Sequence, residues 1–216
     1  MIDWFSGLTS EEQLKAIALA GAALAFIVGL LQYRSTQRWK RAEWVAAEMD
    51  AFFQDPKIQA ALRMIDWGAR RVELYPDRKP REDRFVVVTD DRLAEALEAH
   101  ERRPGGFSED EVTIRDVFDY FLDRLERIQS FVEAGLVRIS DVSPYLRYWA
   151  VDILGAQPGD PKVERLVQLR AYIHRYRYTG VHTLLTKLAR GRPLNVEDQV
   201  QLTRPSSRPP PPAAAG

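Results

Sequence analysis

The 216-residue chain contains no cysteine and only three histidines. Without cysteine, the chain can form no disulfide, no thiolate zinc site and no cysteine nucleophile. Its 31 basic and 31 acidic side chains give a formal net charge of zero, whereas a nucleic-acid-binding domain normally carries a clear basic excess. The composition therefore argues against nucleic acid as a partner, and the lack of cysteine fits a reducing cytoplasm.

The sequence also lacks the usual marks of catalysis. It contains no GxxxxGK[ST], GxGxxG or GxSxG motif. His174 and His182 lie eight residues apart on one helical pattern, about 12 Å along the axis, which is too far for one metal ion. We therefore predict no catalytic residue, no metal site, no cofactor and no enzymatic activity. An enzyme with an unrecognised active site is the most distant alternative.

One helical segment carries a stripe of carboxylates, Asp116, Asp119, Asp123 and Glu126. Paired metal sites in helical bundles also need histidines at Glu-x-x-His spacing, and this segment has no histidine. Basic residues lie four positions away, with Arg115 before Asp119 and Arg127 after Asp123. This spacing predicts a solvated ion-pair face.

Residues 16–33, AIALAGAALAFIVGLLQY, carry no charge and lie between Lys15 and Arg34. As a helix this stretch is roughly 27 Å long, close to the thickness of a hydrocarbon core. A buried core helix and a cleaved signal peptide are the alternatives. The acidic start and the lack of a small-residue cleavage site disfavour a signal peptide. We predict a transmembrane helix over residues 14–33.

The basic residues around this span are unequally distributed. Only Lys15 precedes it, whereas four basic residues follow it closely: Arg34, Arg38, Lys40 and Arg41. Because basic flanks prefer the cytoplasmic side, we predict a single-pass protein of the inner (plasma) membrane, with residues 1–13 outside and residues 34–203 forming a cytoplasmic domain. Trp39 and Trp44 follow the span at a depth where they can contact lipid headgroups, so membrane lipid is a predicted partner.

Small residues recur every four positions in the span, at Gly21, Ala25 and Gly29. Such a stripe lets a second helix approach closely, and it predicts a homo-oligomer formed through the transmembrane helix. The alternative is that these small residues are incidental.

Helical patterns dominate the domain. Asp55-Pro56 marks the start of one helix, and a capping box of Ser108 and Glu111 starts the longest one. Residues 85–89, FVVVT, are the one convincing strand-like run, and a lone strand cannot form a sheet, so an extended segment over the core is the alternative. We predict an all-α fold: the transmembrane helix followed by a cytoplasmic bundle of five or six helices.

The last long helix is predicted to begin at Asp160-Pro161 and to reach Leu188, with Gly180 as a candidate interruption. Within it, Arg170, His174 and Arg177 would share one face, with Tyr178 nearby. Interleaved basic and aromatic side chains can bind single-stranded nucleic acid, nucleotides or lipid headgroups, so we take these four residues as the candidate binding site. The alternative is a core helix with a basic outer side, paired with the acidic stripe. Residues 204–216 are rich in proline and predict a disordered tail.

Residues 117–154 carry a weak family resemblance. It lies in Phe118, Tyr120-Phe121, Leu125-Glu126-Arg127-Ile128, Gly135-Leu136-Val137 and the series Asp141, Tyr145 and Trp149. This stretch resembles uncharacterised bacterial membrane proteins with one amino-terminal span and a helical cytosolic domain, some of which are labelled phage abortive-infection proteins. The resemblance implies a similar layout and carries over no catalytic position.

The interpretation that these features favour is a membrane-tethered helical interaction or scaffold module rather than an enzyme, with a protein partner that the sequence does not identify. The alternative is a membrane-anchored effector or sensor, for example in phage defence.

Overall fold

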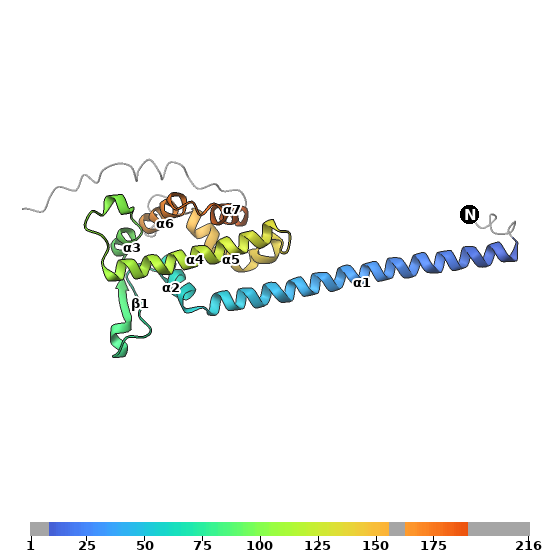
Figure 1. Ribbon diagram of the computed structural model, residues 1–216, viewed down its shortest axis with the longest axis horizontal. Coiled ribbons are helices and arrows are strands. Elements are labelled where there is room, and N and C mark those ends of the chain that lie inside the picture. Colours follow the sequence, from blue (N-terminus) through green and yellow to red (C-terminus); the bar gives the residue numbers. More distant parts are fainter. Residues whose placement is uncertain (1–8, 156–162, 190–216) are drawn as a thin grey trace, which may run out of the picture. The chain divides into compact units, whose positions relative to one another are not determined.

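The computed structural model describes residues 9–155 and 163–189, which belong to two compact units that meet between Ala47 and Glu48 (Figure 1). Residues 1–8 of the predicted outer segment, the predicted helix start at Asp160-Pro161 and the predicted tail 204–216 lie outside the described residues. The description below takes each unit by itself.

The first unit consists of helix α1 (Ser10–Gln54) as far as Ala47, and the helix continues into the first residues of the second unit. Of the described residues, α1 alone is a helix long and apolar enough to cross a membrane. Its large apolar side chains from Ile17 to Leu31 are exposed. An apolar surface of this extent is unfavourable in water, which fits the predicted span over residues 14–33.

The second unit begins with the end of α1 and with α2 (Pro56–Asp66). Phe52, which is fully buried, packs against Phe121 with ring centroids 6.2 Å apart. Asp55 caps α2 as predicted, because its carboxylate accepts from the backbone N–H of Lys57 at 2.9 Å and Pro56 occupies the first turn. The chain is thus held in place where α1 ends.

The strand-like run at residues 85–89 does have a partner. Strand β1 (Arg70–Glu73) pairs antiparallel with β2 (Phe85–Val88), and Val72 lies opposite Val86. A short 3₁₀ helix, η2 (Arg81–Arg84), leads into β2. The sequence alone left open whether residues 85–89 form a strand, because β1, with the sequence RRVE, has a single apolar residue and shows no alternation that would identify it as a partner.

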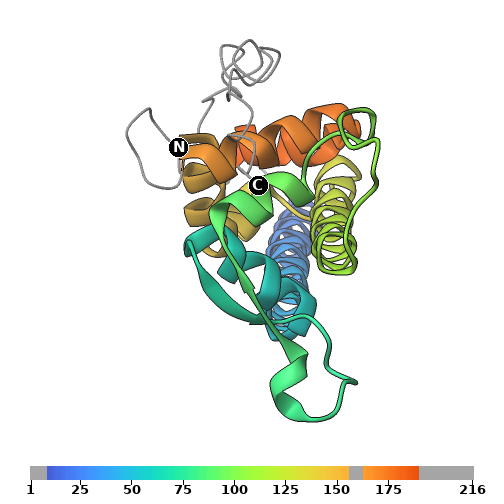
Figure 2. The ribbon, with the colours of Figure 1, turned by 90° about the vertical axis from the view of Figure 1, so that its left-hand side faces the viewer.

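The remaining elements in the described residues are helices α3 (Asp90–Ala96), η3 (His100–Arg102), α4 (Glu109–Glu133), α5 (Ile139–Gly155), α6 (Val163–Arg175) and α7 (Thr179–Leu188). The all-α class is confirmed, with six α-helices after α1 in the part that the structure describes, plus the small hairpin. Helix α4 packs against α2, α3 and α7. Figure 2 shows α4 nearly end-on in yellow-green at the right, with the orange helices α6 and α7 across the top. The capping box of Ser108 and Glu111 begins α4 as predicted.

The predicted last long helix is in fact two helices. The chain turns at residues 176–178, between α6 and α7, and Gly180 lies inside the first turn of α7 rather than at the break. This turn positions the candidate site.

Candidate functional site

Helix α6 ends in a Schellman motif that places an arginine where glycine is usual. The backbone N–H of Tyr178 donates to the Ile173 carbonyl at 3.0 Å, and that of Arg177 donates to the His174 carbonyl at 3.2 Å. Arg177 therefore adopts φ +59°, in the left-handed region. Helix α4 ends in the same motif, with Gly135 at the equivalent position and φ +71°. The left-handed backbone conformation is strained for arginine, whereas glycine adopts it with little strain.

Two tyrosines fix this turn to the acidic stripe of α4. The Tyr172 hydroxyl donates to Asp119 Oδ1 at 2.6 Å, and the Tyr178 hydroxyl donates to the same oxygen at 3.0 Å. Burial, followed by the nearby Asp119 carboxylate, raises the pKa of both phenols above the usual value for tyrosine. Both hydroxyls are therefore stable donors at neutral pH.

Glu126 of α4 caps the first turn of α7. Its Oε1 accepts from the backbone N–H of Gly180 at 2.8 Å and from that of Val181 at 3.1 Å. Tyr178, the residue before α7, supplies no side-chain cap. Because the carboxylate already satisfies these amides, an external anion at this corner would have to be bound by side chains rather than by the helix terminus.

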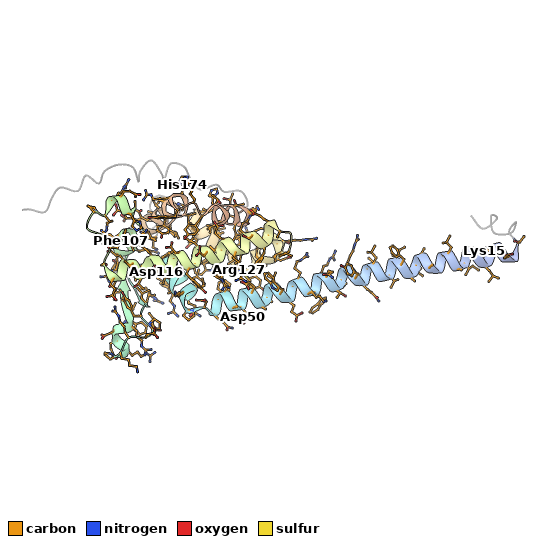
Figure 3. All side chains as sticks on the ribbon, in the orientation of Figure 1. Lys15, Asp50, Phe107, Asp116, Arg127 and His174 are labelled. Atoms are coloured by element: carbon orange, nitrogen blue, oxygen red, sulfur yellow. The ribbon has the colours of Figure 1, made fainter. Side chains whose placement is uncertain are left out.

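A hollow of about 510 Å³ opens at the turn between α6 and α7. We call it the corner hollow; its lining residues are Ile173, His174, Arg175, Arg177, Tyr178, Thr179, His182 and Thr183. Figure 3 labels His174 on α6, in the part of the second unit opposite α2. No carboxylate occurs among these lining residues.

Several donors in the corner hollow have no partner within the described residues. The hydroxyls of Tyr178 and Thr183 are engaged, the latter with the Thr179 carbonyl at 2.8 Å. The uncommitted side chains are those of His174, Arg175, Arg177, Thr179 and His182. A second hollow of about 500 Å³, between α2, β1 and α4, differs because Lys57 and Arg63 share its lining with Glu73, Asp77 and Asp116. The corner hollow is thus the more strongly basic of the two.

The structure places three of the four predicted binding residues together, whereas the prediction for the fourth, Arg170, was wrong. His174, Arg177 and Tyr178 all line the corner hollow. Arg170 does not: it is only 4% exposed, and its Nη1 donates to the Ile153 carbonyl of α5 at 2.8 Å. Arg170 was predicted on the same face because the helix was assumed to continue past residue 175.

Sequence reasoning missed three other residues of the hollow, Arg175, Thr179 and His182. His182 was set aside because an unbroken helix would hold it about 12 Å from His174. The turn at residues 176–178 invalidates that estimate, and both histidines line the same hollow. Among the described residues, no group of three or more His, Asp or Glu side chains could hold a metal ion.

The acidic stripe is not the solvated ion-pair face that its spacing predicted. Asp119 and Glu126 bind the turn between α6 and α7, and Asp123 lies exposed between them. Partial loss of water around the carboxyl group first, and then the charges of Asp119 and Glu126, raise the pKa of Asp123 although its side chain is still exposed. The alternative expectation, that the basic-aromatic segment pairs with this stripe, is correct in outline, but the contacts come from tyrosines and backbone amides instead of arginines.

Arg115 also departs from the predicted pairing with Asp119. It is 6% exposed, and its guanidinium donates to the carbonyls of Ala96 at 2.8 Å and Glu98 at 2.9 Å. It also donates to the Tyr176 hydroxyl at 2.9 Å. Tyr176 is 37% exposed and bridges this arginine to His100. This cluster joins the end of α3 and the residues after it to α4 and to the turn after α6.

The small-residue stripe of α1 is open along the described helix. A methyl group added at Gly21 or at Gly29 would meet nothing within 4 Å. Association through Gly21, Ala25 and Gly29 stays a prediction.

Comparisons of the chain with protein-family models, with curated proteins and with solved structures find no match. The function must therefore be argued from the geometry of the chain.

Proposed function

We propose that this protein is a single-pass membrane protein whose helical domain is a non-enzymatic binding module for an anionic partner in the cytoplasm. The observation that carries the proposal is the corner hollow, which gathers Arg175, Arg177, His174 and His182 around about 510 Å³ with no carboxylate in its described lining. This volume lies within the range of pockets that bind small ligands or single side chains.

The lack of hydrogen bonds and ion pairs at the histidine and arginine side chains of the corner hollow, within the described residues, favours binding over catalysis. Neither His174 nor His182 makes a side-chain hydrogen bond to a hydroxyl group within the described residues, so neither histidine is placed to activate a nucleophile in the corner hollow. The guanidinium groups of Arg175 and Arg177 make no ion pair with any described residue. They are free to accept an anion without first giving up an internal partner.

The membrane part of the proposal depends on α1. Its exposed apolar stretch and the excess of basic residues after Tyr33 support a span with the domain on the cytoplasmic side. Only 14 residues, 34–47, separate the predicted span from the second unit. Even fully extended, they reach about 50 Å, so a partner of the domain would be bound close to the membrane.

The absence of cysteine allows a direct test of binding, because any introduced thiol is the only one. Thr183→Cys places that thiol in the corner hollow, and Ser140→Cys provides a control thiol on the exposed start of α5. The full chain is labelled with an uncharged maleimide in maltoside micelles, with polyglutamate, citrate or glycerol phosphate added at constant ionic strength.

The proposal predicts that at least one of these anions slows labelling at Thr183→Cys and leaves Ser140→Cys unchanged. It also predicts that Arg175→Gln combined with Arg177→Gly removes the protection. If no anion protects the thiol in the hollow, the domain is not the proposed binding module.

A further inference from the structure

We infer that the corner hollow binds a phosphate group carried by a small organic molecule or by a lipid headgroup, and that Arg177 is a principal recognition residue. This inference rests on the proposed function and narrows its anionic partner to one chemical class. It is carried by the set of uncommitted donors, by the shape of the lining and by the backbone conformation of Arg177.

The number of donors favours phosphate over carboxylate. Five side chains of the corner hollow have donor groups without a partner in the described residues: His174, Arg175, Arg177, Thr179 and His182. A carboxylate offers two oxygens, whereas a terminal phosphate offers three strongly accepting oxygens and up to two negative charges. Two guanidinium groups with additional neutral donors match the charge and the oxygen count of a phosphate better.

The hollow also has room and an apolar surface for more than the phosphate itself. Its volume of about 510 Å³ is much larger than one phosphate group requires. The aromatic ring of Tyr178, which is half-buried, belongs to the lining, whereas Ile173 is 1% exposed and offers almost no surface. We therefore expect the phosphate to be attached to an organic group that contacts the apolar part of this lining.

The backbone at Arg177 provides an independent argument. In the equivalent motif at the end of α4, the left-handed position is occupied by Gly135. Glycine would form the α6 turn with less strain, so the backbone gives no reason for arginine here. The Arg177 side chain lines the hollow and makes no hydrogen bond, ion pair or ring contact with another described side chain. A strained residue at the rim of a basic hollow is what a binding role predicts.

The same turn makes Arg177→Gly a sharp test, because the change removes the guanidinium and relieves the backbone. We expect the unfolding midpoint of this variant to stay the same or rise, so that lost binding cannot be attributed to a lost fold. Arg147→Gln is the control for charge: Arg147 is exposed on α5 and is not a lining residue of the corner hollow.

The experiment measures labelling of the single thiol in Thr183→Cys by an uncharged maleimide, using the full chain. One arm titrates glycerol phosphate, or citrate at equal ionic strength, in maltoside micelles that contain no phosphate. The other arm compares nanodiscs that contain phosphatidic acid, whose headgroup is a terminal phosphate, with nanodiscs of phosphatidylcholine alone. Arg177→Gly should raise the concentration of glycerol phosphate needed for half-protection by about tenfold, the effect of losing one charge-assisted hydrogen bond. Arg147→Gln should leave it unchanged.

Protection by glycerol phosphate supports a soluble phosphate ester, and protection only in phosphatidic acid nanodiscs supports a lipid headgroup; either result supports the inference. Protection by citrate alone overturns it while leaving the proposed anion-binding function in place. Protection by no anion overturns both. Equal protection of wild type and Arg177→Gly overturns the role assigned to Arg177.

Discussion

Glu126 and Gly180 form a contact between α4 and α7 whose energetic coupling can be measured. The Glu126 carboxylate caps the first turn of α7, and a methyl group added at Gly180 would collide with that carboxylate, lying only 2.9 Å from Cδ. Gly180→Ala should therefore push the carboxylate away from the amides, although alanine is otherwise the better helix former. The two substitutions are expected to be strongly non-additive.

The magnitudes follow from the contacts that change. Glu126→Ala leaves two backbone N–H groups without their acceptor, which should lower the free energy of unfolding by about 1–2 kcal/mol. Gly180→Ala loses the same cap but gains helical propensity, so we expect a net loss of about 0.5–1 kcal/mol. In the Glu126→Ala background no carboxylate remains to be displaced, and Gly180→Ala should instead stabilise by about 0.5 kcal/mol. The coupling energy is then about 1–1.5 kcal/mol.

The assay is urea unfolding of the four full-length proteins in nonionic micelles, combined with hydrogen exchange at the amides of residues 180 and 181. Exchange at these amides should accelerate in both single variants. Glu126→Gln is the matched control, because it keeps an acceptor and loses only the charge, at a cost below about 1 kcal/mol. If Gly180→Ala costs the same with and without Glu126, the carboxylate does not cap α7 in the way described.

Three further predictions concern other positions. Arg177→Gly should raise the free energy of unfolding by about 0.5–1 kcal/mol, because relieving the strained left-handed backbone outweighs the larger conformational entropy of glycine in the unfolded chain. Gly135→Ala should lower the free energy of unfolding by about 1 kcal/mol. Urea unfolding that gives changes of the same sign for both variants would contradict this explanation. Asp123→Asn should stabilise the domain at pH 7, since the folded state raises the pKa of Asp123 and so disfavours its charge. The gain should vanish as the pH falls through that folded pKa, where wild-type Asp123 is itself neutral; a gain independent of pH would refute the explanation. Gly21→Leu with Gly29→Leu should abolish association of the span in a membrane reporter, and unchanged association would show that the small residues are incidental.

Locally determined features of the fold could be predicted from the sequence. The caps at Asp55 and at Ser108 with Glu111 depend on residues within one helical turn, and both are found where the spacing places them. The end of α4 at Gly135 is equally local, because glycine adopts the left-handed conformation at little cost.

Features that depend on distant residues could not be predicted in this way. Strand β1 is recognisable only beside β2, and the turn after α6 has arginine at the position where glycine would have signalled it. That turn is held by Asp119 and Glu126, which lie more than fifty residues earlier in the chain. The break in the helix was placed near Gly180 because the local sequence does not show the contacts with Asp119 and Glu126.

The candidate site was predicted in part, and the error at Arg170 has an identifiable cause. Arg170 is four residues from Leu166 and three from Ile173, so it borders the apolar stripe of α6, and this spacing could have indicated burial. The helical projection that joined it to Arg177 assumed an unbroken helix. His182 was excluded by the same assumption.

The central claim is that the corner hollow belongs to a membrane-held domain that faces the cytoplasm, and the sidedness of one thiol tests it most directly. In bacterial spheroplasts that express the full-length chain with Thr183→Cys, we expect a membrane-impermeant maleimide to label the thiol only after lysis, with the labelled chain remaining in the membrane pellet. Ser6→Cys, which precedes the span, should be labelled before lysis. Labelling of Thr183→Cys in intact spheroplasts, or its recovery in the soluble fraction, would contradict the account.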